Sequence, residues 1–233
     1  PASIKIFTSS VSWAKAMLKK VVLSHNFIFG SKDRSRYDMT QIHDVDADQS
    51  GWSALCAALP ASPVEELDVS NIGMGVTGVT SLAKAISSMA VLTSLNCSGN
   101  AIGEPGAQTL IKSIESSESL QFIVVGHPLP LKEPYVSNAL DVSKKGLTPG
   151  DAIILAWWIK TPFSAVINEV NVSLNPIGFE GAKALAAVIP QSSLQVIILG
   201  IACKVKEGVN TIAATRGAFA IMDGRGGELT RNP

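Results

Sequence analysis

The stretch LTSLNCSGNAIGEPGAQTLIKSI, residues 92–114, recurs in recognisable form at two other places in the chain. Residues 64–86 read VEELDVSNIGMGVTGVTSLAKAI, and residues 167–189 read INEVNVSLNPIGFEGAKALAAVI. Each copy has apolar residues at positions 1, 4, 6, 11, 19 and 23 and glycines at positions 12 and 15. This frame predicts a unit made of one strand, a turn and one returning helix.

The unit has a period of 28 residues, which is the spacing between the starts Val64, Leu92 and Leu120. Weaker copies of the strand are LKKVVLSHNFI at 18–28, LQFIVV at 120–125, NALDVS at 138–143 and LQVIIL at 194–199. Seven strands that each return through a helix predict an α/β fold. We expect a curved parallel sheet of about seven strands with the helices on its convex side.

The pattern L-x-x-L-x-L-x-x-N-x-I-G-x-x-G-A-x-x-L, carried by residues 92–110 and 167–185, resembles the ribonuclease-inhibitor-like class of leucine-rich repeats. The same class occurs in sensor domains of innate-immunity receptors and in Ran-type GTPase-activating proteins. The resemblance covers most of residues 18–200 and implies a leucine-rich-repeat solenoid. It is specific for the fold and almost silent about function.

The repeat pattern divides the chain into an N-terminal cap segment at 1–17, a repeat array at 18–200, and a C-terminal cap and tail at 201–233. An insertion at 30–49 lengthens the first repeat by 18 residues. A short proline-rich repeat at 126–137 has three prolines within seven residues, which disfavours a helix. We expect an extended connection there and a gap in the helical layer.

Position 9 of the repeat is asparagine in only part of the array. In the family that the pattern resembles, this asparagine bonds backbone groups of the turn. Asparagine occupies the position at Asn26, Asn100 and Asn175, and the other repeats have Ile72, Pro128, Lys145 and Ala202. The sequence therefore predicts an interrupted asparagine ladder.

The second repeat contains GMGVTG, residues 73–78, a G-x-G-x-x-G motif between an expected strand and an expected helix. In that context the motif can cradle a dinucleotide pyrophosphate. However, Gly75 and Gly78 coincide with glycines of sister repeats, and no acidic residue follows about 20 residues later. The motif therefore favours a strand-to-helix turn over a nucleotide site, with an irregular backbone at Ile72 and Gly73.

Residues 43–52, HDVDADQSGW, have the alternating carboxylates of a calcium loop. Gln49 and Leu55 stand where such a loop needs Gly and Glu, so the pattern does not favour metal binding. We expect instead an acidic segment that caps a helix through Asp48 or Ser50.

No catalytic, cofactor-binding or metal-binding residue is predicted elsewhere. Cys56 and Cys97 fall at repeat positions that face the core, which favours small buried residues over nucleophiles. His25 and His127 occupy the same repeat position but three strands apart, too far for a shared metal. Trp157 and Trp158 lie in an expected helix, where core packing or a partner contact explains them.

The composition is that of a folded protein with few charges. Hydrophobic residues make up 46% of the chain, and charged residues make up only 16%, below the roughly 25% usual for soluble domains. This favours a surface partly covered by partners. The formal net charge of zero gives no support for nucleic-acid binding. No apolar run approaches the roughly 18–20 residues of a transmembrane helix.

Three scattered cysteines, Cys56, Cys97 and Cys203, argue against a disulfide framework and favour an intracellular, reducing compartment. The chain begins with Pro1 rather than Met, which is also compatible with an organelle if a targeting peptide was removed upstream.

Two surfaces are candidates for partner binding. Position 5 of the strands places four polar residues on the open side of the sheet: Asp68, Asn96, Asp141 and Asn171. The insertion begins with three basic residues, Lys32, Arg34 and Arg36, and inserted loops on repeat scaffolds are frequent recognition elements. For both surfaces, a merely solvated role is an equally open interpretation.

The sequence thus predicts a non-enzymatic protein–protein interaction module that binds other proteins as a structural or scaffold subunit of a larger assembly. The alternative is a GTPase-activating regulator that resembles the Ran-type leucine-rich-repeat activators. That alternative needs a catalytic polar residue on a turn at one end of the array, and no residue here matches one by position.

Overall fold

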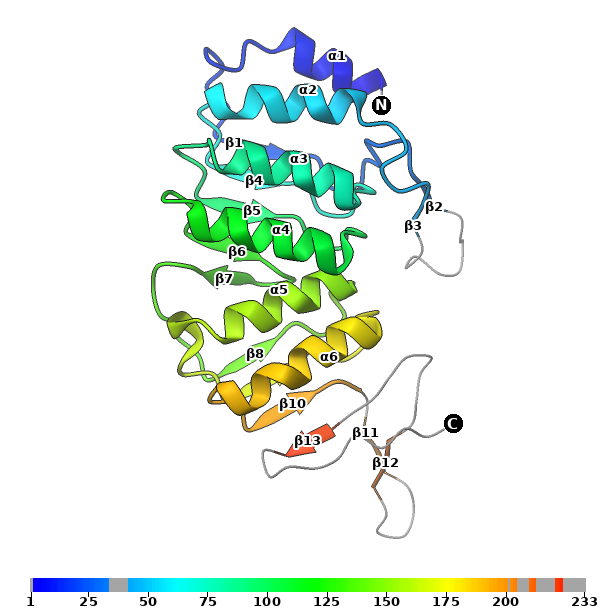
Figure 1. The fold of residues 1–233 in the computed structure, drawn as a ribbon, viewed down its shortest axis with the longest axis vertical. Coiled ribbons are helices and arrows are strands. Elements are labelled where there is room, and N and C mark those ends of the chain that lie inside the picture. Colours follow the sequence, from blue (N-terminus) through cyan, green and yellow to red (C-terminus); the bar gives the residue numbers. More distant parts are fainter. Residues whose placement is uncertain (1, 34–41, 201, 205–209, 213–220, 224–233) are drawn as a thin grey trace.

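The computed structural model describes residues 2–33, 42–200, 202–204, 210–212 and 221–223. Its helices stack in one layer along the molecule, with the strands beside them (Figure 1). The described α-helices are α1 (Ala2–Ser10), α2 (Ser50–Ala58), α3 (Val76–Ile86), α4 (Gly103–Ser116), α5 (Pro149–Ile159) and α6 (Gly178–Val188). Short 3-10 turns follow α2, α5 and α6 as η1 (Leu59–Ala61), η2 (Pro162–Ser164) and η3 (Ile189–Gln191).

A strand lies in each of the seven repeat copies that the sequence predicts. These strands are β1 (Lys20–Val22), β4 (Glu66–Asp68), β5 (Ser94–Asn96), β6 (Phe122–Val124), β8 (Ala139–Asp141), β9 (Glu169–Asn171) and β10 (Val196–Ile198). Neighbouring strands pair in parallel from β1 to β6 and again from β8 to β10. The alternation of apolar residues thus located the strands correctly.

The predicted single sheet is corrected by the hydrogen bonds, which form two main sheets. The first has the order β1-β4-β5-β6-β7, and the second has the order β13-β10-β9-β8. The added strands β7 (Pro128–Pro130) and β13 (Ile221–Asp223) pair antiparallel with β6 and β10. Two small antiparallel hairpins join β2 (Lys32–Asp33) to β3 (Ile42–His43) and β11 (Ala202–Lys204) to β12 (Asn210–Ile212).

Prolines explain why the first sheet ends at β7. The N–H of Leu131 donates to the carbonyl of Gln121 at 2.7 Å, so the odd-numbered residues of this segment face β6. The alternate residues, Pro128 and Pro130, point their backbones away from β6, and they have no N–H to donate. The ladder therefore cannot continue into the second sheet.

The edge of β8 that does not pair with β9 is closed by a side chain. The N–H of Glu169 in β9 donates to the carbonyl of Asn138, which places the backbone groups of Ala139 on the opposite edge of β8. The hydroxyl of Ser137 accepts from the N–H of Ala139 at 3.2 Å and lies 3.0 Å from the Ala139 carbonyl, to which it can donate. Both edges at the break are thus blunted against pairing.

The predicted gap in the helical layer is wrong, although the extended connection at 126–137 is confirmed. Helix α4 packs directly against α5, so the interruption lies in the sheet and the helices bridge it (Figure 1). The indole of Trp158 donates to the carbonyl of Pro130 at 2.8 Å, and the indole of Trp157 donates to Glu115 at 2.9 Å. Tyr135 packs edge-on against Trp158, with 5.7 Å between ring centroids.

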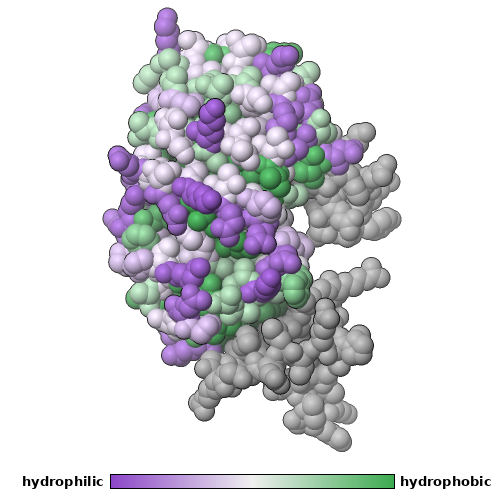
Figure 2. Space-filling view, in the orientation of Figure 1, coloured by the Kyte–Doolittle hydropathy of each residue, from purple (hydrophilic) through white to green (hydrophobic). Residues whose placement is uncertain are grey.

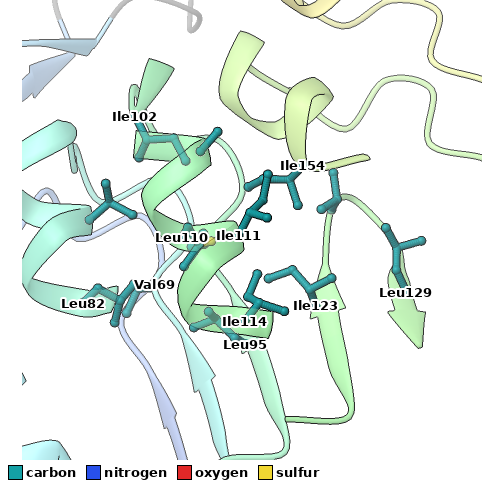
Figure 3. Packing of buried hydrophobic residues seen from close by; sticks show 14 of the residues in the cluster. Val69, Leu82, Leu95, Ile102, Leu110, Ile111, Ile114, Ile123, Leu129 and Ile154 are labelled. Carbon is teal, nitrogen blue, oxygen red and sulfur yellow. The ribbon is translucent and has the colours of Figure 1, made fainter. Parts of the chain in front are cut away.

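The core lies between the helices and the sheets. The central residue of each repeat strand is buried, while its neighbours are exposed or half-buried. Figure 3 shows Leu110, Ile111 and Ile114 of α4 packing toward Leu95 and Ile123 of the strands. Burial of this apolar stripe against the sheet is the main source of stability for each repeat.

Asn100 ties the third repeat to the second. Its side-chain oxygen accepts from the N–H groups of Ile72 and Met74 at 3.0 and 3.2 Å. Its side-chain NH2 donates to the carbonyls of Val69 and Cys97, both at 2.8 Å. Asn100 is fully buried, so it satisfies four backbone groups that water does not reach.

The predicted interruption of the asparagine ladder is confirmed. Asn175 repeats the arrangement in the second sheet, where it accepts from Lys145 and Leu147 and donates to the carbonyl of Val142. Asn26, by contrast, is exposed and donates within its own turn. Direct asparagine bridges between repeats therefore occur once in each half of the array among the described residues.

We predict that Asn100→Ala lowers the free energy of unfolding by about 3 kcal/mol, because it leaves two buried N–H groups and two carbonyls without this partner. Asn175→Ala, at a half-buried site, is expected to cost about 1–2 kcal/mol, and the exposed control Asn26→Ala less than about 0.5 kcal/mol. Urea unfolding of the three variants measures the order. Equal costs for all three would contradict the ladder.

Candidate functional site

The strand face turned away from the helices, which we call the open face, carries the predicted partner-binding residues. The first sheet contributes Lys20, Val22, Glu66, Asp68, Ser94, Asn96, Phe122 and Val124; the second contributes Ala139, Asp141, Glu169, Asn171, Val196 and Ile198. All of these side chains are exposed or half-buried. Strand register brings Asp68 next to Asn96 and Asp141 next to Asn171. The sheet break separates the two pairs.

Asp68 and Asn96 share one local geometry. The carboxylate oxygen of Asp68 accepts from the N–H and the hydroxyl of Ser70, at 3.0 and 2.7 Å. Asn96 accepts from the N–H and the hydroxyl of Ser98, at 3.2 and 2.8 Å. These are Asx turns, in which a side chain bonds the backbone two residues later and ends the strand. One polar atom of each predicted residue is therefore engaged in the turn.

The second pair repeats this motif. Asp141 accepts from the N–H of Ser143 at 2.8 Å, and Asn171 accepts from that of Ser173 at 3.0 Å. The hydrogen bonds from Ser143, with smaller contributions from Lys145 and Lys144, lower the pKa of Asp141 below its usual value. Each side chain keeps a second polar atom that its turn does not use.

Apolar side chains lie between the two polar pairs. Phe122 and Val124 of β6 share the open face with Pro128 of the neighbouring β7. At one end of the face the ammonium group of Lys20 forms a salt bridge with Glu66 at 2.7 Å, and this contact raises the pKa of Lys20. The open face thus offers two polar sites around an apolar middle.

The helix side has a different character. Figure 2 shows hydrophilic and hydrophobic residues intermixed over its described part, without one broad apolar area. Phe179 at the start of α6 and Val76 at the start of α3 are exposed apolar side chains there. On this side of the molecule the exposed apolar side chains are therefore scattered and do not form one patch.

Of the basic residues predicted in the insertion, the structure places Lys32 in β2, paired in register with His43 of β3. Arg34 and Arg36 lie outside the described residues. Whether these three residues bind a partner stays a prediction.

The insertion is fastened to the array by Asp46. Its carboxylate accepts from the N–H groups of Gly75 and Thr77, both at 2.8 Å, and from that of Gly78 at 3.2 Å to each oxygen. These N–H groups form the amino-terminal end of α3, where a negative charge is favoured. The N–H of Asp46 also donates to the carbonyl of Gly73, at 3.2 Å.

The motif GMGVTG is therefore both a turn and an anion cradle. Its predicted place between strand and helix is confirmed, because Gly75 is the N-cap of α3. The sequence predicted that these glycines serve only the strand-to-helix turn, and the structure gives them a second role. A Cβ on Gly75 would lie 2.5 Å from Val45 and 2.7 Å from the Asp46 carboxylate, and a Cβ on Gly78 would lie 2.7 Å from the same carboxylate. The glycines make room for the insertion, whose carboxylate fills the cradle.

The other acidic residues of the insertion do not converge with Asp46. Asp48 accepts from the N–H of Ser50, the first residue of α2, at 2.8 Å, but the N-cap residue is Gln49 and not Asp48 or Ser50 as predicted. These bonds from Ser50 lower the pKa of Asp48. Within the described part of the chain, no group of three or more His, Cys, Asp or Glu side chains is placed to hold a metal ion.

The cysteine predictions are confirmed where the side chains are described. Cys56 and Cys97 are buried and form no disulfide. Burial raises the pKa of Cys56 to about 12 and raises the pKa of Cys97 still further. Thiols held in the neutral form are core residues rather than nucleophiles. His127 bonds the hydroxyl of Tyr135 at 3.1 Å, next to Trp158.

Sequence reasoning missed Asp151, which lies almost fully buried in the first turn of α5. It forms a capping box with Thr148, the N-cap residue, and also accepts from the N–H of Gly99 at 2.8 Å. The signal was present, because Thr148 followed by Pro149 and then by Asp151 is a helix-start signature. The contact with Gly99, 52 residues earlier, had no sequence signal.

A family model described as "Leucine Rich repeat" matches residues 164–186, which contain β9 and most of α6. The chain carries a leucine-rich repeat. No curated protein matches it by sequence. A solved structure titled "Leiomodin-1 Actin-Binding Site 2 (ABS2)" is similar over 86% of this chain and 78% of that chain, with 8% identity and a TM-score of 0.38.

Among the described residues, no helix combines the length and the apolar character that crossing a lipid bilayer requires.

We predict that Asp46→Asn lowers the free energy of unfolding by about 2 kcal/mol, because an NH2 group then faces backbone N–H donors and the charge at the helix end is lost. Urea unfolding measures the change. The matched control is Asp44→Asn, at an exposed residue that also has a positive φ, and it should cost less than about 0.5 kcal/mol. Equal losses in the two variants would contradict the assigned role of Asp46.

Proposed function

We propose that this chain is a non-enzymatic protein-interaction module that binds a partner protein through its open face. We further propose that its repeats belong to the ribonuclease-inhibitor-like class, stack as a solenoid over residues 18–200, and serve as a scaffold subunit of a larger assembly. The observation that carries the proposal is the placement of two in-register polar pairs, Asp68–Asn96 and Asp141–Asn171, on one exposed strand face.

The chemistry of the open face supports binding to a protein rather than catalysis. Rigid strands present the two pairs, and each Asx turn holds its side chain in one orientation while leaving a second polar atom for a partner. The apolar middle, with Phe122 exposed, supplies area that is favourable to bury. Polar groups around an apolar centre are the usual anatomy of a protein interface.

The composition supports the scaffold role. A chain with only 16% charged residues and no net charge has little electrostatic help in remaining a free monomer. Exposed apolar side chains occur on both sides of the molecule, with Val22 and Val196 on the open face and Phe179 on the helix side. Contacts with more than one neighbour would cover them.

We predict that a photo-crosslinking residue placed at Asn96 or at Asn171 captures the same discrete partner from native extract. Matched probes at the exposed Lys112 and Lys183, on helices α4 and α6, are expected to capture it at least about tenfold less, because they point away from the open face. Mass spectrometry of the adducts identifies the partner, and purified components then test direct binding. Equal capture from the four positions would remove the open face from the proposal.

A further inference from the structure

The sheet break divides the described array into two halves that share no backbone ladder. β7 ends the first sheet with Pro128 and Pro130, and Ser137 closes the edge of β8 that does not pair with β9. The halves are held together instead by helix packing between α4 and α5 and by a few polar contacts across the break. Such an arrangement concentrates the coupling between the halves in a small number of side chains.

Asp151 is the most buried of these side chains, with 1% of its surface exposed. It belongs to α5, in the second half, and its carboxylate accepts from the N–H of Gly99 in the first half at 2.8 Å. The same oxygen accepts from the N–H of Thr148 at 2.8 Å and lies 2.9 Å from the Thr148 hydroxyl. One carboxylate oxygen therefore ties the first turn of α5 to the loop that follows β5.

The Thr148 hydroxyl has two possible acceptors and a single proton. It lies 2.9 Å from the Asp151 carboxylate and 3.0 Å from the carbonyl of Asn100, which belongs to the first half. While Asp151 is ionised, its charge draws this proton to the carboxylate. Once Asp151 is protonated, its own O–H can donate to the Thr148 oxygen, and the Thr148 hydroxyl is then free to donate to Asn100. Protonation thus frees a hydrogen bond from Thr148 to Asn100 across the break, while the N–H of Gly99 then faces a neutral acceptor in place of a charged one. The cost of keeping the charge buried decides the balance between these effects.

Among the described residues, the two salt bridges are Lys19–Glu65 and Lys20–Glu66, and neither involves Asp151. Charged residues on the helices that pack against α5 are all exposed: Glu104, Lys112 and Glu115 on α4, and Glu180 and Lys183 on α6. On the strand side the thiol of Cys97 is electrostatically coupled to Asp151, and Asp68 acts on that same thiol.

We propose that the break is a pH-dependent joint, in which protonation of Asp151 tightens the coupling between residues 20–131 and residues 138–200. The two halves move as one body when the carboxyl is neutral. They separate more readily when it is ionised, because opening returns a buried charge to water.

The direction of the pH dependence follows from burial. Burial is the largest influence on Asp151 and raises its pKa to about 6, against the opposing effect of the bonds from Thr148 and Gly99. The closed joint therefore binds a proton more tightly than the open joint, whose carboxyl has the ordinary value of 3.8. Acidification from pH 7.5 to pH 5 favours closure, and the opening constant is expected to fall about tenfold.

Amide hydrogen exchange measures this opening directly. The probe is the N–H group of Gly99, which donates to Asp151 across the break. After correction for intrinsic exchange rates, we expect its protection in the full chain to be about tenfold higher at pH 5 than at pH 7.5. Asp151→Asn, a neutral side chain of the same shape, should remove this pH dependence.

The matched control is Asp141→Asn, which changes an exposed carboxyl whose pKa is lowered and which does not titrate in this range. It should keep the pH dependence of the unmodified chain. Spin labels carried by unnatural amino acids at 66 and 169, one on each sheet, should give a narrower distance distribution at pH 5 than at pH 7.5. The same narrowing in Asp151→Asn, or pH-independent protection of Gly99 in the unmodified chain, would overturn the proposal.

A direct titration keeps the test decisive if Asp151→Asn does not fold. The carboxyl carbon of Asp151 in the unmodified chain, followed by NMR, should titrate near pH 6. A titration midpoint of Asp151 at or below the ordinary value of 3.8 would overturn the proposed pH dependence of the joint.

Discussion

Two missing N–H groups determine how this chain is divided. Pro128 and Pro130 alternate with Leu129 and Leu131. The backbone groups of the two leucines face β6, and those of the two prolines face the opposite edge of β7. An edge without donors cannot pair with β8. Because the backbone ladder ends there, the side chains of Trp158, Trp157 and Tyr135 and the packing of α4 on α5 must hold the halves together.

Carboxylates at helix amino termini are used twice to make long-range connections. Asp46 reaches the start of α3 from the insertion, and Asp151 reaches back from the start of α5 to Gly99. Asp46 is partly exposed, so water shares in solvating its charge and the contact acts mainly as a fastening. Asp151 is almost fully buried, so the same kind of contact becomes sensitive to the protonation of the carboxyl.

The features that were predictable from sequence are those set by local spacing. The alternation around Leu67, Leu95 and Val170 placed the strands and the core, because side chains of a strand point alternately to its two faces. The antiparallel pairing of β7 was also within reach, since prolines alternating with leucines fit an edge strand. The contacts of Asp46 and Asp151 were not predictable, because they join residues about 30 and 52 positions apart whose proximity depends on the finished fold.

The open face and the joint are mechanically related. The polar pair Asp68–Asn96 belongs to the first sheet and the pair Asp141–Asn171 to the second, so the state of the break sets the distance and angle between them. A partner that touches one pair is indifferent to that state. A partner that touches both pairs binds one arrangement better than the other, and linkage then requires that it change proton binding at Asp151 by the same factor that protonation changes its affinity. The division made by two prolines would thus couple recognition to pH through Asp151, a carboxyl that lies outside the interface.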